Sequence, residues 1–126
     1  MARIILHIHS LGGGGAERVW AVLASGLARR GHETLFVVER TDDANRSFLD
    51  ASVKLKVFDA PSHLGQIAEM AALWRQVRPH VVLTASSSNL KAALARTGVR
   101  HGPSLVVSVH GAVGTGILGR AADGRP

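Results

Sequence analysis

The sequence predicts an α/β fold built on a doubly wound parallel sheet. Apolar segments of strand length alternate along the chain with amphipathic segments of helical length. Several strand segments, such as residues 35–38, are continuously apolar, which is typical of parallel strands covered on both faces. A run of four glycines separates the first strand segment from the first helical one, as in doubly wound sheets that bind ligands at their carboxyl edge.

Residues 4–9 form the first predicted strand, and residues 17–30 form the first predicted helix. Apolar side chains in this helix follow the i, i+3, i+4 spacing that indicates one buried face. They are Val19, Trp20, Leu23 and Leu27. Gly31 follows the last helical residue, in the position where glycine commonly ends a helix.

The middle of the chain continues the alternation. Residues 33–39 contain the second strand, and residues 53–58, where apolar side chains alternate with lysines, form a third strand near a sheet edge. A second helix begins after Ser62, its predicted N-cap, and ends at Pro79. Its predicted buried stripe consists of Ile67, Met70, Ala71, Trp74 and Val77.

Two further strands enclose one more helix. Residues 81–84 form the fourth strand, and residues 105–109 form the fifth, which ends at His110. The helix between them begins among Ser86 to Asn89, ends at Gly98, and is expected to bury its apolar residues. These are Leu90, Ala93 and Leu94.

Length and composition predict one globular domain. Residues 1–111 carry the pattern described above, and residues 112–126 form a glycine-rich tail in which it fails. The absence of cysteine excludes disulfides and thiolate metal sites. The net charge of +6 comes from scattered side chains without interleaved aromatic residues, which argues against nucleic-acid binding. Arginines lie closer together only in two wide windows, at Arg75/Arg78 and Arg96/Arg100.

The glycine run offers a site for a phosphate or a sugar. Glycine lets the backbone approach a ligand closely, and a helix that begins directly after it adds free N–H donors. A dinucleotide site is an alternative, with Glu39 as the ribose-binding acid, but Glu17 stands where the third fingerprint glycine belongs. A non-catalytic sugar- or phosphate-binding module is a second alternative. No cofactor is expected.

Polar residues after three strands are expected to meet at one rim of the sheet. His9 and Ser10 follow the first strand, the turn from Thr84 to Asn89 follows the fourth, and His110 ends the fifth. Because the ends of parallel strands share an edge, these segments should border one crevice. Metal binding by His7 and His9 is disfavoured, since no third ligand is suitably spaced.

The segments Leu11–Val19 (LGGGGAERV) and Leu27–Glu33 (LARRGHE) resemble the opening of retaining glycosyltransferases with the GT-B fold, of the family 4 or group 1 type. The segments Arg78–Val82 (RPHVV) and Val107–Gly111 (VSVHG) resemble that family's approach to its fourth strand and its histidine-bearing strand. The resemblance extends over residues 3–111.

This resemblance implies a Rossmann-like N-terminal domain that binds the acceptor in a hexosyl-transferring enzyme. The donor is a nucleotide-sugar, held by a C-terminal domain with a Glu-x7-Glu motif. Gly13, Gly14 and Gly15 would approach the donor diphosphate, and His110 would lie near the transferred sugar as the catalytic residue. Residues of the crevice are expected to bind an acceptor that the sequence does not identify. These are His9, Ser10, Glu17, Arg18, Ser86, Ser87 and Asn89.

The chain departs from that pattern because it lacks the donor-binding domain, and no glutamate follows Glu69. The resemblance therefore predicts an incomplete N-terminal GT-B domain that is inactive as an isolated chain. An open fifth strand predicts self-association. The expected location is the cytoplasm, and the positive charge is compatible with peripheral association with an anionic membrane.

Overall fold

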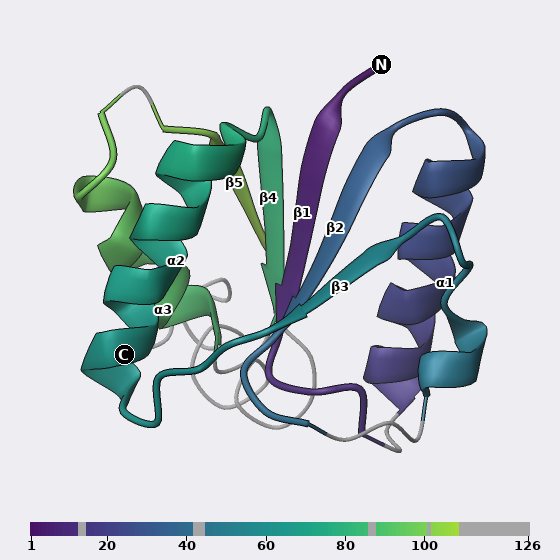
Figure 1. The fold of residues 1–126 in the computed structure, drawn as a ribbon, viewed down its shortest axis with the longest axis horizontal. Coiled ribbons are helices and arrows are strands. Elements are labelled where there is room, and N and C mark those ends of the chain that lie inside the picture. The colour runs from purple at the N-terminus through teal and green to yellow at the C-terminus, as the bar shows by residue number, and fades with distance from the viewer. Residues whose placement is uncertain (13–14, 42–44, 86–87, 101, 109–126) are drawn as a thin grey trace, which may run out of the picture.

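The fold is a five-stranded, entirely parallel sheet with helices on both faces (Figure 1). The computed structural model describes residues 1–12, 15–41, 45–85, 88–100 and 102–108. The strands are β1 (Arg3–Ile8), β2 (Glu33–Val38), β3 (Lys54–Val57), β4 (Val81–Ala85) and β5 (Ser104–Ser108). The helices are α1 (Gly15–Arg29), the 3₁₀ turn η1 (Arg46–Phe48), α2 (His63–Val77) and α3 (Ser88–Thr97).

The strand order β3-β2-β1-β4-β5 places the first strand at the centre of the sheet. The chain runs outward from β1 through β2 to β3, then crosses to β4 and runs outward the other way to β5. Right-handed crossovers therefore put α1 on one face and α2 and α3 on the other (Figure 1). The order reverses between β1 and β4, which is where doubly wound sheets bind ligands.

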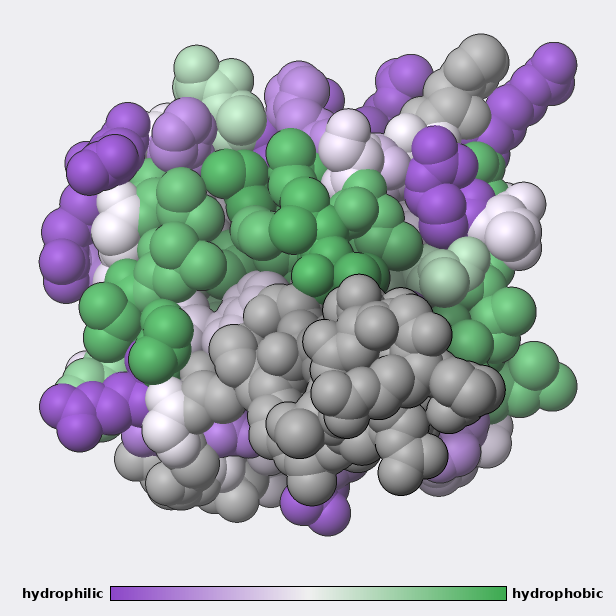
Figure 2. Space-filling view, turned by 180° about the vertical axis from the view of Figure 1, so that it is seen from behind, coloured by the Kyte–Doolittle hydropathy of each residue, from purple (hydrophilic) through white to green (hydrophobic). Residues whose placement is uncertain are grey.

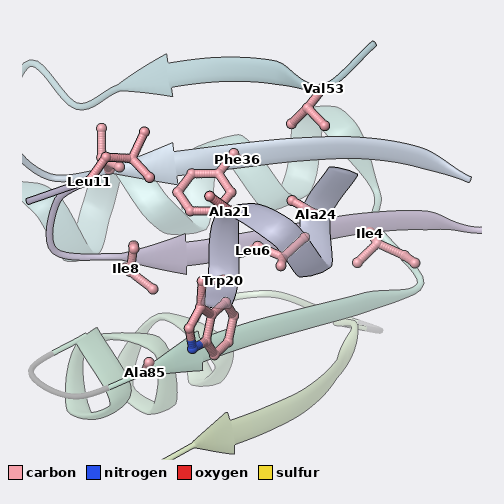
Figure 3. Packing of buried hydrophobic residues seen from close by; sticks show 11 residues of the cluster. Ile4, Leu6, Ile8, Leu11, Trp20, Ala21, Ala24, Phe36, Val53 and Ala85 are labelled. Carbon is pink, nitrogen blue, oxygen red and sulfur yellow. The ribbon is translucent and has the colours of Figure 1, made fainter. Parts of the chain in front are cut away.

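Each face of the sheet has its own hydrophobic core. Ile4, Leu6 and Ile8 of β1 pack with α1, as Figure 3 shows. Ile5 of β1 points to the opposite face and packs in the core formed with α2 and α3, where Trp74 is among the largest buried side chains. The alternating side chains of one strand thus join both cores, as predicted for a strand covered on both sides.

The predicted buried stripe of α1 is wrong in part. Val19 and Leu23 are 62% and 42% exposed, whereas Trp20, Ala21 and Ala24 are buried against the sheet. The two alanines let the helix backbone approach the sheet closely. The hydroxyl of Ser25, on the same side, donates to the carbonyls of Ala21 and Phe48, both at 2.9 Å, and so fixes the helix against η1.

The predicted buried stripe of α3 is also wrong. Leu90 is 70% exposed and Leu94 is 48% exposed, while the buried positions are Ser88, Lys91, Ala92 and Ala95. The helix is rotated about its axis relative to the predicted orientation, because Lys91 reaches a buried carboxylate at the rim of the sheet, described below. In α2, Met70, Ala71 and Trp74 are buried as predicted.

The predicted helix ends and the edge position of β3 are confirmed. The Ser62 hydroxyl caps α2 by accepting from the N–H of Gly65 at 3.0 Å, and Gly31 has a positive φ of 89° after α1. β5 forms the other edge of the described sheet, where Val106 and Val107 are about half exposed. Within the described ranges, none of the helices has the length and apolar character required to cross a bilayer.

Candidate functional site

A pocket of about 350 Å³ opens at the rim where the strands end. Because all five strands are parallel, the segments that follow β1, β2 and β3 reach this one rim. The first turns of α2 and α3 close the pocket from the side. Its polar lining includes His9, Glu39, His63, Gln66 and Lys91.

The carboxylate of Glu39 is the centre of the polar network at this rim. One oxygen, Oε2, accepts from Ser88 Oγ at 2.7 Å and lies 3.0 Å from His7 Nε2. The other, Oε1, accepts from Lys91 Nζ at 2.5 Å, and the same ammonium donates to Gln66 Oε1 at 2.7 Å. The Glu39 side chain is only 1% exposed, so the network replaces water around a buried charge.

Hydrogen bonding keeps Glu39 ionised. Burial alone would raise the pKa of this carboxyl, but hydrogen bonds from His7, Lys91 and Ser88 outweigh it and hold the pKa well below its usual 4.5. Burial lowers the pKa of His7 from 6.5, despite the opposing effect of Glu39. We therefore assign a neutral His7 that donates its Nε2 proton to Glu39. Its buried Nδ1 has no hydrogen-bond partner among the described residues.

His9 connects the buried network to solvent. Its Nδ1 lies 3.5 Å from Glu39 Oε1, while 44% of its side chain is exposed. The carbonyl of His9 also accepts from the N–H groups of Glu39 and Arg40, at 2.9 and 3.1 Å. These backbone contacts hold His9 at the pocket wall, while its Nδ1 has no hydrogen-bond partner among the described residues. The described residues contain no group of three or more potential metal ligands, including around His7 and His9.

The start of the glycine run is held by its neighbours. The hydroxyl of Ser10 accepts from the N–H of Gly12 at 3.2 Å. Asn45 donates its own N–H to the carbonyl of Leu11 at 2.9 Å and its side-chain amide to the carbonyl of Gly12. Gly15 begins α1 and is exposed, and a Cβ added there would meet no atom within 4 Å. The loop thus leads directly into a helix N-terminus.

Other predicted site residues have different surroundings. Glu17 is partly buried in the first turn of α1, and the guanidinium of Arg18 lies 4.4 Å from the centre of the Phe48 ring. Asn89 Oδ1 accepts from the Thr84 hydroxyl at 2.8 Å, which joins the end of β4 to α3. The predicted residues Gly13, Gly14, Ser86, Ser87 and His110 lie outside the described residues.

Sequence reasoning missed most of the Glu39 network. From the sequence, Glu39 is predicted only as a possible ribose ligand, and Lys91, Gln66 and Ser88 are not predicted as site residues. One available signal was a glutamate placed directly after a continuously apolar strand. A second was Lys91, which shares a helical face with Ser88, Ala92 and Ala95.

Comparisons with known proteins concern both sequence and fold. The family model described as Glycosyltransferase Family 4 matches residues 13–124. The search of curated proteins found no match. Among solved structures, the chain is similar to Phytolacca americana UGT2 complexed with UDP-2fluoro-glucose and pterostilbene, with a TM-score of 0.58 and 16% identity. That match covers 84% of this chain but only 30% of the other, and at this identity it concerns the fold alone.

Proposed function

This chain belongs to glycosyltransferase family 4, and from that premise we propose that it forms the acceptor-side half of an enzyme that transfers a sugar from a nucleotide-sugar. The observation that carries the proposal is the pocket at the carboxyl rim, bordered by the segments that follow β1, β2 and β3. Gly12, after β1, and Gly15, the first residue of α1, lie at the same rim. Acceptor and donor would then meet above β1.

The donor diphosphate would be bound by backbone groups rather than by a cationic side chain. Gly13, Gly14 and Gly15 would allow close approach, and the first N–H groups of α1 would point toward the phosphates. The partial positive charge of the helix N-terminus favours the same ligand. His110 would act beside the transferred sugar, and charge stabilisation of the departing diphosphate would supply much of the catalysis.

The acceptor would enter the pocket beside His9. Glu39 is unsuited to act as a general base there, because both of its oxygens already accept hydrogen bonds within the chain. Its role would be to hold the rim in place, while the partly exposed imidazole of His9 can hydrogen-bond an acceptor hydroxyl. Further acceptor contacts are proposed for Ser10, Glu17, Arg18, Ser86, Ser87 and Asn89.

The hydrogen bonds that Glu39 already accepts also argue against a dinucleotide-binding site. Such a site needs a free acidic side chain after the second strand to bind the ribose hydroxyls. Glu39 has the expected position, but His7, Ser88 and Lys91 already occupy it. Calorimetric titration should therefore detect no tight NAD or NADP binding. Micromolar affinity for NAD would overturn the proposal in favour of an oxidoreductase.

The decisive test reconstitutes the second half of the enzyme. The 126-residue chain alone should release no nucleoside diphosphate from a panel of nucleotide-sugars, whereas a fusion to a family 4 donor-binding domain should do so with an acceptor present. In that fusion, His110→Ala should lower kcat more than acceptor affinity. Turnover by the monomeric chain alone would contradict the half-enzyme proposal. Sugar binding without transfer in the fusion would favour a non-catalytic module.

Gly15 offers a sharper test of the donor loop. Since its Cβ position is open, Gly15→Val should fold as well as the parent chain. If the loop contacts the diphosphate, the same substitution should weaken nucleotide-sugar binding in the fusion. A matched Gly26→Val control sits in the same helix, also with an open Cβ position, and should leave binding unchanged. Equal affinities for both variants would show that the loop is only a turn.

A further inference from the structure

A second pocket, of about 380 Å³, opens at the opposite end of the sheet. It lies beside the amino ends of β1, β4 and β5 and the carboxyl end of α2, and its lining includes Arg3, Trp74, Arg75, Arg78 and Arg100. The central strand has six residues, so this pocket is roughly 20 Å from the carboxyl rim. It is therefore separate from the proposed transfer site.

The residues that line this pocket carry positive charges without a negative charge beside them. Four arginines contribute to it, and it has no Asp or Glu among its lining residues. Within the described part of the chain, none of the four lies within 4.0 Å of a carboxylate; Glu33, the β2 residue in register with Arg3, makes no such contact either. Like charges held around one concave surface repel one another, and an anion between them removes that repulsion.

The positions of two arginines are fixed by the backbone. Arg3 donates from Nε to the carbonyl of Arg78 at 3.0 Å. Arg78 itself is the C-cap of α2 and has a left-handed backbone with φ of 54°, a position where glycine or asparagine is usual. The backbone at this position favours another residue type, yet it carries an arginine that lines the pocket.

A buried side chain with an unpaired donor lies beside these charges. Trp74 lines the pocket and is 1% exposed, and its buried indole Nε1 has no hydrogen-bond partner among the described residues. Buried N–H groups are nearly always paired, so an unpaired one marks a place where a partner is missing. The missing partner must be an acceptor, because indole nitrogen only donates.

We propose that this pocket binds an oxyanion, and specifically a phosphate group. Planar guanidinium groups form paired N–H···O bonds to phosphate oxygens, and four arginines line this one pocket. The pocket volume falls within the range of small-ligand sites, about 300–1,000 Å³, and exceeds what a bare phosphate needs. The phosphate would therefore belong to a larger molecule, either a soluble phosphorylated compound or a phospholipid headgroup.

The test uses the two indole resonances of the chain. Titration with inorganic phosphate at low ionic strength should shift the Trp74 indole N–H signal saturably and leave that of Trp20 in place, since Trp20 lies in the other core. A Trp20→Phe spectrum assigns the two signals. In the Arg75→Gln/Arg100→Gln variant the dissociation constant should rise about tenfold or more. Both arginines are exposed, so the variant should melt as the parent does.

A matched control variant removes two positive charges at the same end of the molecule but outside the pocket. Arg30→Gln/Lys54→Gln also loses two exposed cations, and it should change the dissociation constant less than twofold. If both double variants weaken binding equally, the attraction comes from net charge and the pocket proposal is wrong. Absence of a saturable Trp74 shift in the parent chain would overturn it as well.

Vesicles distinguish the two sources of the phosphate. The chain is sedimented with vesicles of phosphatidylcholine alone and with equimolar phosphatidylcholine and phosphatidylglycerol. Binding only to the anionic vesicles, lost in Arg75→Gln/Arg100→Gln and kept in the control, would identify a lipid headgroup. Phosphate binding without vesicle binding would identify a soluble compound. Failure of sugar transfer in the fusion would leave either result standing, because the two sites share no residue.

Discussion

The buried charge of Glu39 connects segments from β1, β2 and α3 at the carboxyl rim of the sheet. Placing a carboxylate out of water is costly, and the cost is offset only when its oxygens are fully hydrogen-bonded. Here the donors come from β1 and α3, while the carboxylate follows β2. Removal of the charge should therefore affect the folded state more than removal of an exposed one.

The first prediction concerns this pair of charges. Glu39→Gln leaves the Lys91 ammonium buried without its counter-charge and should lower the free energy of unfolding by about 3–5 kcal/mol. Lys91→Met in the same background should recover part of that loss, since the uncompensated charge is gone. Urea denaturation measures both, with Glu33→Gln, an exposed acid, as the control. Equal small losses for Glu39→Gln and Glu33→Gln would show that the network contributes little.

The second prediction concerns acid sensitivity. Burial lowers the pKa of His7 in the folded state, so below its usual 6.5 the unfolded chain binds a proton that the folded chain does not. Stability is therefore fully present above about pH 6.5 and falls as the pH decreases below it, by up to about 1.4 kcal/mol per pH unit. Glu39 adds a second loss that begins near its usual 4.5, because its folded pKa is also lowered.

Substitution of His7 separates its contribution to the pH dependence of stability from that of Glu39. His7→Gln can still donate to Glu39 but does not titrate, so its unfolding free energy should be nearly constant between about pH 7 and pH 5. Urea denaturation at a series of pH values measures the slope. A parent chain and a His7→Gln variant with the same slope in this interval would contradict the assignment of a neutral buried His7.

At the level of elements, the five described strands and the three α-helices were predicted from the sequence, but the 3₁₀ turn η1 and some buried faces were not. Strand positions were predictable because continuous apolar runs occur wherever two faces are covered. The buried face of α3 was not, because Lys91 is buried by a partner 52 residues earlier in the chain. Helical periodicity of apolar residues contains no information about such a partner. The pocket was predicted only in part: it lies at the carboxyl rim and includes His9, but segments after β2 and β3 line it, and neither Thr84 nor Asn89 does.

The third prediction tests the orientation of α1. Ala24 is fully buried against the sheet, so Ala24→Leu should overpack the core and cost about 1–3 kcal/mol. Leu23 is 42% exposed, and Leu23→Ser should cost less than about 1 kcal/mol. Urea denaturation of the two variants compares adjacent positions of one helix. A larger loss of unfolding free energy for Leu23→Ser than for Ala24→Leu would instead support the buried face predicted from the sequence, which includes Leu23.

At the scale of the whole molecule, hydrophobic side chains remain at the surface near the β5 edge. The strand register puts Val106 on the face that α1 covers, and this residue is 48% exposed. Figure 2 shows hydrophobic residues gathered over this side of the molecule. On α1 itself, Val19 and Val22 are also more than half exposed. An apolar surface of this kind promotes association.

The fourth prediction follows from that surface. The chain should self-associate in a concentration-dependent manner, and Val106→Lys should shift the population toward monomer by placing a charge on the apolar face. Sedimentation velocity at several concentrations measures this. Gln76→Lys adds the same charge at an exposed site on α2 and should leave association unchanged. A monomeric parent chain at all concentrations would contradict the prediction.

The central position of β1 determines the order in which the molecule can be completed during synthesis. β1 precedes both of its neighbours in the chain, and one of them, β4, begins only at residue 81. Until then one edge of the middle strand is unpaired, and Glu39 lacks the ammonium of Lys91. One edge of β1 therefore stays unpaired throughout the synthesis of β2, β3 and α2. Chaperone binding should be strongest in that interval, and truncation before residue 91 should prevent folding altogether.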